Sequence, residues 1–155
     1  MATDNGSQGS TQYALYRFFR LDPAWRRLPV EERAAGKDAF AEVVEAWEER
    51  MGLLTYSLVG VRPETDFFFW QLTERWEDFR DLAADLNATP LAGYLSTPYS
   101  YVAATLSSKY FHRNPKLPPR RIVPRRGPYL VVYPFVKVRP WYSLALADRK
   151  RAMQE

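Results

Sequence analysis

LLTYSLVGVRPETDFFFWQLT, residues 53–73, is the stretch that decides the fold. Residues 53–61 and 66–73 are rich in aromatic and β-branched side chains, which are typical of strands. The turn-forming sequence Pro-Glu-Thr-Asp lies between them. This pattern predicts two antiparallel strands that are joined as a hairpin.

The segments on either side of the hairpin extend the pattern. QYALYRFFRL, residues 12–21, alternates as a strand does. Between residues 31 and 51 apolar side chains recur at helical spacing, and Gly52 follows as a signal for the helix end. The same reasoning predicts a second helix over residues 74–88 and a fourth strand over residues 98–107.

The resulting order, strand-helix-strand-strand-helix-strand, is that of an α+β, ferredoxin-like unit with an antiparallel sheet and helices on one face. We therefore expect a flexible tail over residues 1–11 and a complete N-terminal ferredoxin-like domain over residues 12–107. Residues 108–128 form a basic connection rich in proline and arginine. A strand over residues 129–137 and a helix after it restart the order, so residues 129–155 predict the start of a second, incomplete ferredoxin-like domain.

Charge is divided unevenly along the chain. Residues 1–85 carry 10 basic and 16 acidic side chains, whereas residues 86–147 contain no Asp or Glu. The cations of this acid-free stretch are Lys109, Arg113, Lys116, Arg120, Arg121, Arg125, Arg126, Lys137 and Arg139. Because a solvated surface normally mixes both signs, the stretch predicts a surface that meets an anion. The alternative is a basic loop in water or at a subunit interface.

The composition excludes several kinds of site. The chain has no cysteine and one histidine, His112, so disulfides, thiolate metal sites and a cysteine nucleophile are excluded. His112 has no second histidine for a zinc site, and we expect no metal held by side chains of this chain. No apolar run reaches the roughly 18 residues that a membrane span needs, and the polar start is not a signal peptide. We expect a cytoplasmic protein without a membrane span.

The acid-free stretch and the end of the chain carry a set of motifs. In chain order these are Tyr99-Ser100-Tyr101, the run ending at Tyr110, Pro119-Arg120, Tyr133-Pro134-Phe135 with Lys137, Trp141-Tyr142-x-Leu144, and the helix from Arg149 to Met153 before Glu155. In these motifs the chain resembles the chlorite dismutase-like family of heme proteins. The resemblance covers residues 12–155, and the block around Tyr133 and Trp141 is its specific part.

The resemblance implies a tandem of two ferredoxin-like units of the dimeric α/β-barrel type, with an iron porphyrin, heme or coproheme, in the second unit. It places the axial histidine directly after Glu155, so the chain as written reads as C-terminally truncated. It also implies a homo-oligomer, a pentamer or a dimer. The cofactor-binding residues that it implies are Tyr110, Arg120, Tyr133, Phe135, Lys137, Trp141 and Tyr142, with Arg121 in place of Arg120 if the loop register differs by one.

Two reactions divide the family. One branch splits chlorite into chloride and dioxygen, and the other decarboxylates coproheme to heme with peroxide, using the tyrosine of the YP motif as a radical relay. Tyr133 stands where that catalytic tyrosine belongs, and the Trp141-Tyr142 pair resembles the decarboxylase. The resemblance therefore favours a heme-dependent oxidoreductase of the coproheme decarboxylase type, with chlorite dismutase as the alternative.

Other interpretations of the same residues stay open. Without the resemblance, Tyr133 is a core or interface residue, Trp141 and Tyr142 form a packed elbow, and the loop arginines are solvated. The chain could also be a non-catalytic assembly module that lacks the axial histidine. A nucleic-acid-binding sheet is a further alternative, but residues 66–73 lack the glycine motif and the cations of RNA-recognition domains, and we expect no nucleic-acid partner.

Overall fold

The computed structural model describes residues 11–105, 121–124, 127, 129–136 and 138–152. The strands are β1 (Tyr13–Leu21), β2 (Gly52–Ser57), β3 (Phe67–Thr73) and β4 (Leu95–Ala104). The α-helices are α1 (Val30–Glu48), α2 (Glu77–Asn87), α3 (Arg139–Ser143) and α4 (Leu146–Ala152), and the 3-10 helices are η1 (Pro23–Arg27) and η2 (Pro90–Tyr94).

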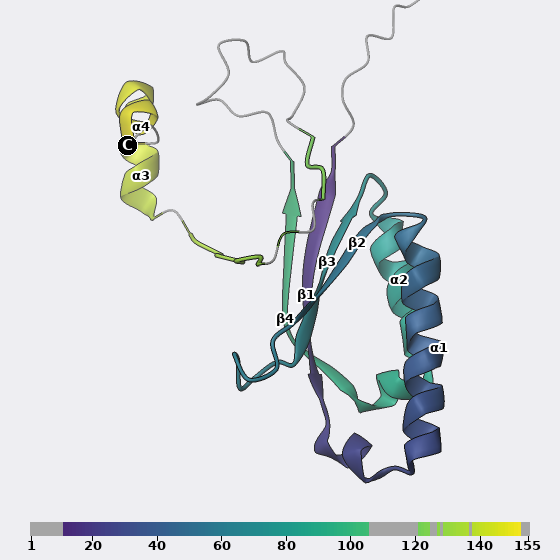
Figure 1. Ribbon diagram of the computed structural model, residues 1–155. Coiled ribbons are helices and arrows are strands. Elements are labelled where there is room, and N and C mark those ends of the chain that lie inside the picture. The colour runs from purple at the N-terminus through teal and green to yellow at the C-terminus, as the bar shows by residue number, and fades with distance from the viewer. Residues whose placement is uncertain (1–10, 106–120, 125–126, 128, 137, 153–155) are drawn as a thin grey trace, which may run out of the picture.

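The four strands form one antiparallel sheet in the order β2-β3-β1-β4. Helices α1 and α2 lie against the same face of this sheet (Figure 1). This confirms the predicted α+β, ferredoxin-like fold, including the hairpin of β2 and β3. The opposite face of the sheet, which we call the open face, carries no helix of the described chain.

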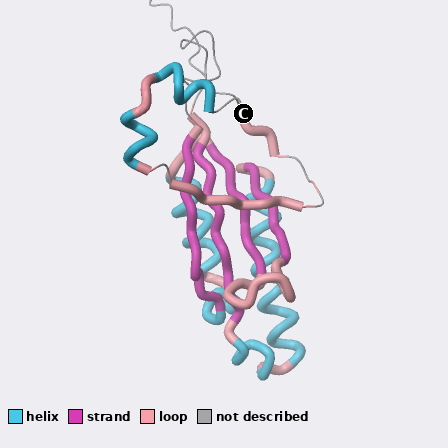
Figure 2. The backbone as a smooth tube through the Cα atoms, turned by 90° about the vertical axis from the view of Figure 1, so that its left-hand side faces the viewer, coloured by secondary structure: helices cyan, strands magenta, loops and turns pink. Residues whose placement is uncertain are grey.

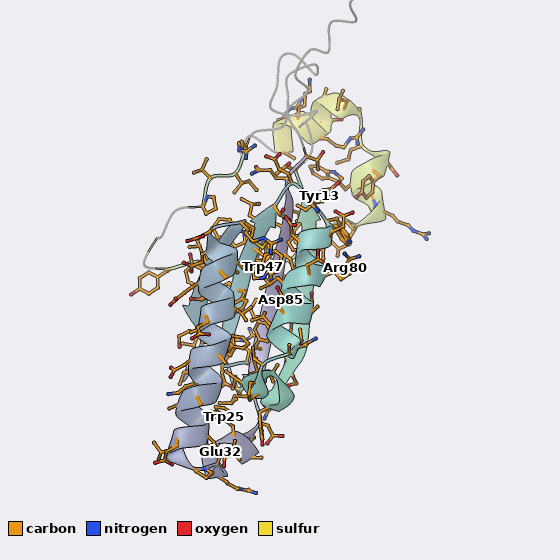
Figure 3. All side chains as sticks on the ribbon, turned by 90° about the vertical axis from the view of Figure 1, so that its right-hand side faces the viewer. Tyr13, Trp25, Glu32, Trp47, Arg80 and Asp85 are labelled. Atoms are coloured by element: carbon orange, nitrogen blue, oxygen red, sulfur yellow. The ribbon has the colours of Figure 1, made fainter. Side chains whose placement is uncertain are left out.

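The core lies between the sheet and the two helices. Phe19 of β1, Phe69 of β3 and Leu82 of α2 are at most 5% exposed. Burial of each such side chain contributes roughly 1.5–3 kcal/mol. Trp47 of α1 is 2% exposed, and its indole N–H donates a hydrogen bond of 2.8 Å to Asp85 of α2 (Figure 3). This bond joins the two helices and satisfies the polar atom of a buried tryptophan.

The hairpin turn is longer than the sequence predicts. β2 ends at Ser57 rather than at residue 61, and the turn closes with a hydrogen bond of 2.7 Å from the Leu58 N–H to the Asp66 carbonyl. Gly60 lies in this turn with a φ of 79°, which glycine adopts without strain. α1 ends at Glu48, so that Gly52 opens β2 instead of ending the helix.

β4 also begins earlier than predicted, at Leu95 rather than at residue 98. The sequence prediction placed Pro98, which lacks a backbone donor, at the first position of the strand. In the structure Pro98 lies inside the strand, where the register between β4 and β1 shifts between Phe18 and Arg20. An edge strand with an irregular register tolerates a proline there, since a ladder bond is already missing.

The strand predicted over residues 129–137 is wrong for the described residues 129–136, which belong to no strand. They cross the open face of the sheet as a loop (Figure 2). A segment of strand-forming residues becomes a strand only when a partner supplies hydrogen bonds, and no described strand pairs with this one. Helix α4 confirms the helix predicted after it, and α3 makes the Trp141-Tyr142 elbow helical.

Candidate functional site

An aromatic ladder crosses the open face of the sheet from one edge to the other. Tyr56, Phe68, Phe18 and Tyr99 occupy paired positions on β2, β3, β1 and β4. The ring centroids are 5.0 Å apart for Tyr56 and Phe68, 4.9 Å for Phe68 and Phe18, and 6.3 Å for Phe18 and Tyr99. Such contacts add roughly 0.5–1.5 kcal/mol per pair beyond burial. The ladder therefore makes this face a rigid apolar platform.

A second row lies beside the ladder. Tyr16 and Trp70 stack with ring centroids 6.2 Å apart, and Tyr101 is paired with Tyr16 on the far side. Burial raises the pKa of the Tyr16 hydroxyl above its ordinary value. Both rows are uncharged, and this part of the sheet is suited to apolar packing.

The aromatic side chains on the two central strands match one requirement of a nucleic-acid platform. The other requirement is a set of cations along the same face, which neutralise phosphates. Among the described open-face positions of the four strands, only Arg20 is charged. The charge pattern thus favours packing against an apolar partner segment over stacking with nucleic-acid bases.

Residues 129–134 lie over this platform and leave two cavities beneath them. One cavity of about 650 Å³ is lined by Tyr56, Phe68 and Leu130 among others. A second cavity of about 340 Å³ is lined by Phe18, Tyr99 and Leu130 among others. The crossing segment is therefore seated on the platform, and its outer side chains face away from the sheet.

The predicted catalytic residue, Tyr133, is one of these outer side chains. Tyr133 is 79% exposed and Phe135 is 68% exposed, and their rings stack with centroids 6.2 Å apart. Tyr142 of α3 is 64% exposed and stacks on neither ring in the described part of the chain. Trp141, also on α3, is half-buried. Of the predicted site residues, the structure thus brings the rings of Tyr133 and Phe135 into contact.

Tyr110, Arg120 and Lys137 of the predicted site lie outside the described residues, as does His112. Arg121, the alternative to Arg120, is described and forms an ion pair with Glu74. No cluster of three or more His, Cys, Asp or Glu side chains that could hold a metal occurs in the described part of the chain.

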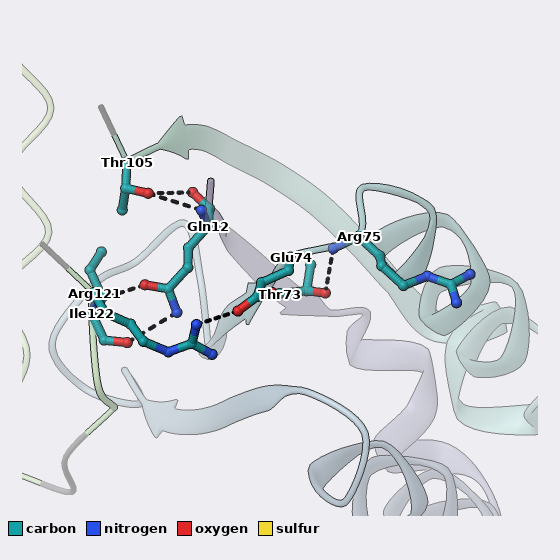
Figure 4. A network of polar contacts seen from close by, with 7 residues as sticks. All are labelled: Gln12, Thr73, Glu74, Arg75, Thr105, Arg121 and Ile122. Carbon is teal, nitrogen blue, oxygen red and sulfur yellow. Dashed lines mark hydrogen bonds and ion pairs between the residues drawn. The ribbon is translucent and has the colours of Figure 1, made fainter. Parts of the chain in front are cut away.

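A polar network that the sequence did not reveal fastens residues 121 and 122, inside the basic connection, to the sheet (Figure 4). The Ile122 N–H donates to the side-chain oxygen of Gln12 over 2.7 Å, and the Gln12 amide nitrogen donates to the Ile122 carbonyl over 3.2 Å. Gln12 also exchanges hydrogen bonds with Thr105, which directly follows β4. Nothing in the local sequence pattern marks Gln12, because its partner lies 110 positions away.

The sequence profile of the family described as Chlorite dismutase matches residues 23–155. The chain belongs to the chlorite dismutase family. The family assignment agrees with the resemblance carried by the motifs around Tyr133 and Trp141, which lie inside the matched region.

Solved structures of low sequence identity share the fold. An arginine-to-glutamate variant of chlorite dismutase from Candidatus Nitrospira defluvii has a TM-score of 0.77 at 20% identity, over 93% of this chain and 62% of that one. A cyanide complex of a tryptophan-to-phenylalanine variant gives 0.60 at 21%, over 64% and 42%. A heme-binding protein from Thermus thermophilus gives 0.56 at 24%, over 62% and 40%. The chain thus spans less than two thirds of the length of each of these structures.

The described residues fit an iron porphyrin by their chemistry. A porphyrin is a flat apolar disc with carboxylates at its rim, which calls for aromatic walls, hydroxyls and cations. The stacked rings of Tyr133 and Phe135 supply an exposed apolar wall with one phenolic hydroxyl. Arg139 opens α3 directly after this segment, and no acid occurs over residues 86–147.

The described helices include none that is long and apolar enough to cross a membrane.

Proposed function

We propose that the protein is a heme-binding oxidoreductase that decarboxylates coproheme to heme with peroxide. The observation that carries the proposal is the exposed phenol of Tyr133, stacked on Phe135 within the region that matches the family. A side chain of this size costs free energy to leave in water, so an exposed aromatic pair marks a surface that meets a ligand or a partner. Tyr133 also carries a phenolic hydroxyl, the group that a radical relay requires.

The residues of the acid-free stretch have separate roles in this proposal. Phe135, Trp141 and Tyr142 form walls against the porphyrin ring. Arg120 and Lys137 bind carboxylates by charge-assisted hydrogen bonds, each worth about 1.5–3 kcal/mol, and Tyr110 donates a further one. Coproheme presents four carboxylates, which is a chemical match for a stretch with nine cations and no acid. An axial histidine is expected to follow Glu155.

Tyr133 acts as the relay between the oxidant and the substrate. When bound, the iron porphyrin supplies the oxidising power that it takes from peroxide. The phenolic oxygen of Tyr133 would give up its hydrogen as a proton and an electron, and the resulting tyrosyl radical would take a hydrogen atom from the β-carbon of the neighbouring propionate. That propionate would then lose carbon dioxide and one further electron, which the second oxidising equivalent of the peroxide accepts, and a vinyl group would remain. The phenol is restored in the same step, so that Tyr133 serves both propionates in turn.

The proposal extends to the organisation of the protein. Residues 12–107 form the first ferredoxin-like domain, residues 108–128 the basic connection and residues 129–155 the start of the domain that holds the porphyrin. The protein works as a homo-oligomer in the cytoplasm. The open face of the first sheet, with its uncharged aromatic ladder, supports a tandem arrangement because it is suited to packing against a second sheet.

Chlorite dismutation is the second candidate function. It is favoured by the family description and by the solved structures of chlorite dismutase that share the fold. One experiment separates the two reactions. The protein is loaded with coproheme and given peroxide, and the products are resolved by chromatography and mass spectrometry; in parallel the heme-loaded protein is given chlorite in an oxygen electrode. Conversion to heme supports decarboxylation, whereas rapid dioxygen release without conversion supports dismutation. If the protein binds porphyrin but carries out neither reaction, an assembly or storage role remains.

A further inference from the structure

One margin of the sheet stays exposed on the face that α1 and α2 occupy. β4 is an edge strand, and its side chains on this face are exposed. They are Ser100, Val102 and Ala104, which are paired with Arg17, Leu15 and Tyr13 of β1. Val102 is 53% exposed although its partner Leu15 is buried in the core. The cover that the helices give to β1 therefore does not extend over β4.

An exposed tryptophan continues this surface onto α2. Trp76, which precedes α2, is 52% exposed, and its ring lies edge-on to that of Tyr13 with centroids 5.6 Å apart. Tyr13 is paired with Ala104, which lies two residues from Val102 on the same face. Arg80 follows Trp76 by one helical turn, on the side of α2 that points away from α1 (Figure 3). We call this surface the β4 margin and define it by Tyr13, Arg17, Trp76, Arg80, Ser100 and Val102.

Arg17 is a cation of the β4 margin without a carboxylate. It is half-buried, and its guanidinium lies 5.8 Å from the ring centroid of Phe19. Within the part of the chain that the structure describes, Arg17 forms no ion pair, whereas Arg80 pairs with its neighbour Asp81. Burial lowers the pKa of the Arg17 guanidinium below its ordinary value. A charge that is partly withdrawn from water costs free energy unless an opposite charge binds it, so the margin is suited to a partner that brings an acid.

The outer face of α1 carries exposed acids. On the side of the helix opposite to the buried Phe40 and Trp47, acidic side chains recur at helical spacing up to the C-cap. They are Glu31, Asp38, Glu42, Glu45 and Glu49. The exposed alanines Ala34 and Ala41 lie among them and allow another surface to approach closely. The last turn of α1 has no basic residue, and the negative end of the helix dipole there favours a cation.

We propose that the β4 margin of one copy of this chain binds the outer face of α1 of a second copy, where Arg17 pairs with a carboxylate. The inference rests on the homo-oligomer of the proposed function and names its surfaces. α1 lies toward β2, at the opposite edge of the sheet from β4. The two surfaces are thus distinct, and a contact between distinct surfaces repeats around a closed ring. A two-fold dimer through the margin would instead bring like charges together and leave Arg17 unpaired.

The test uses two variants that each lose one surface. Val102→Glu puts an acid on the β4 margin, which the acids of α1 repel, and Glu42→Arg with Glu45→Arg reverses the charge of α1. We expect each variant alone to be a monomer, while an equal mixture forms a dimer with one copy of each, because each retains the surface that the other lacks. Analytical ultracentrifugation and native mass spectrometry measure both results. Val59→Glu is the control, since Val59 is 70% exposed in the hairpin turn and belongs to neither surface.

Arg17→Met separates binding from stability. Methionine keeps much of the aliphatic stem and removes the charge. We expect the association constant between copies to fall about tenfold, because an ion pair at the contact is lost. The unfolding temperature of the dissociated chain should not fall, because the charge that is removed has no carboxylate partner there. A role in the fold alone would lower the unfolding temperature and leave the association constant unchanged.

The outcomes are distinct. A ring of the parent, monomers of both single-surface variants and a mixed dimer support the inference. A monomeric parent, or a mixture without the mixed dimer, overturns it. Parent-like assembly of the α1 variant also overturns it, because the margin then pairs with itself. Ser100→Glu repeats the test on the same margin, and loss of cooperative unfolding in both margin variants would overturn the inference by making the margin part of the fold.

Conversion of coproheme by the parent is measured separately. A monomer that converts coproheme overturns this inference and leaves the proposed chemistry standing. A ring with the expected mixed dimer but without conversion overturns the proposed chemistry and leaves the inference standing.

Discussion

Arg121 forms an ion pair with Glu74, which joins the basic connection to the residue that follows β3 (Figure 4). A guanidinium held by a carboxylate has fewer donors for a ligand carboxylate, since the paired N–H groups are used. The ion pair thus separates two neighbouring arginines by role. Arg121 is a tether to the sheet, and Arg120 is the one that we propose for the porphyrin.

We expect Arg120→Ala to weaken porphyrin affinity about tenfold or more, because one charge-assisted hydrogen bond is lost. Arg121→Ala should weaken it by about threefold or less, because its exposed ion pair contributes little. Titration of each variant with iron coproporphyrin measures its affinity. The reverse order of effects would show that the loop register differs by one and that Arg121 is the ligand.

Trp25 of η1 packs closely against Gly36 of α1. A Cβ added at Gly36 would lie 2.7 Å from the Cη2 atom of Trp25, and this indole is buried, at 5% exposed. Alanine is a better helix former than glycine by up to about 1 kcal/mol, but overpacking a core costs about 1–3 kcal/mol. Gly36→Ala should therefore lower the free energy of unfolding by about 1 kcal/mol.

Chemical denaturation measures this change, and Gly93→Ala is its control. A Cβ at Gly93 in η2 meets no atom within 4 Å. Its substitution should change the stability by about 0.5 kcal/mol or less in either direction. A Gly36→Ala variant that is more stable than the parent would mean that η1 moves aside at little cost.

The arrangement of the first domain was predictable from the sequence, because its helices repeat apolar side chains at helical spacing and its strands are rich in aromatic and aliphatic side chains between turn signals. The first and last residues of the individual helices and strands were not predictable. Leu95 joins β4 because it pairs with Leu21, and pairing is a property of the neighbour rather than of the residue. The residues of 129–136 have high strand propensity but no partner among the described strands, so they form a loop.

The candidate site likewise contains residues that the sequence predicted and residues that it did not. Tyr133 and Phe135 were predicted because they stand in a recognisable motif, and the structure places their rings in contact. Gln12 and Glu74 were not found, because each acts on a residue far along the chain and neither stands in a motif. A long-range contact through a single amide leaves no period in a sequence.

Tyr16 makes the stability of the sheet sensitive to alkaline pH. Burial raises the pKa of its hydroxyl in the folded state above the ordinary value of 10.0. The neutral phenol is therefore favoured by folding, and this contribution is fully present below pH 10.0 and is lost as the pH rises through the folded-state pKa. We expect the unfolding temperature of Tyr16→Phe to fall less steeply above that pH than that of the parent. Tyr101→Phe controls for the loss of one hydroxyl on the same face, and equal slopes for Tyr16→Phe and the parent would contradict the prediction.

The last prediction concerns Tyr133, whose ring is 79% exposed, so that its hydroxyl contributes little to packing. Tyr133→Phe keeps the ring and its stacking on Phe135, and should change the free energy of unfolding by about 1 kcal/mol or less. If Tyr133 is the relay, coproheme affinity stays within about twofold of the parent while the rate of conversion with peroxide falls by about 100-fold or more, since binding and the chemical step depend on different atoms. Tyr129→Phe is the matched control, because Tyr129 lies on the same segment, is 88% exposed and should keep the parent's rate. Stopped-flow absorbance and chromatography of the products separate the two quantities. Full conversion by Tyr133→Phe would reduce Tyr133 to a wall of the site, and equal losses in both variants would assign the effect to the segment as a whole.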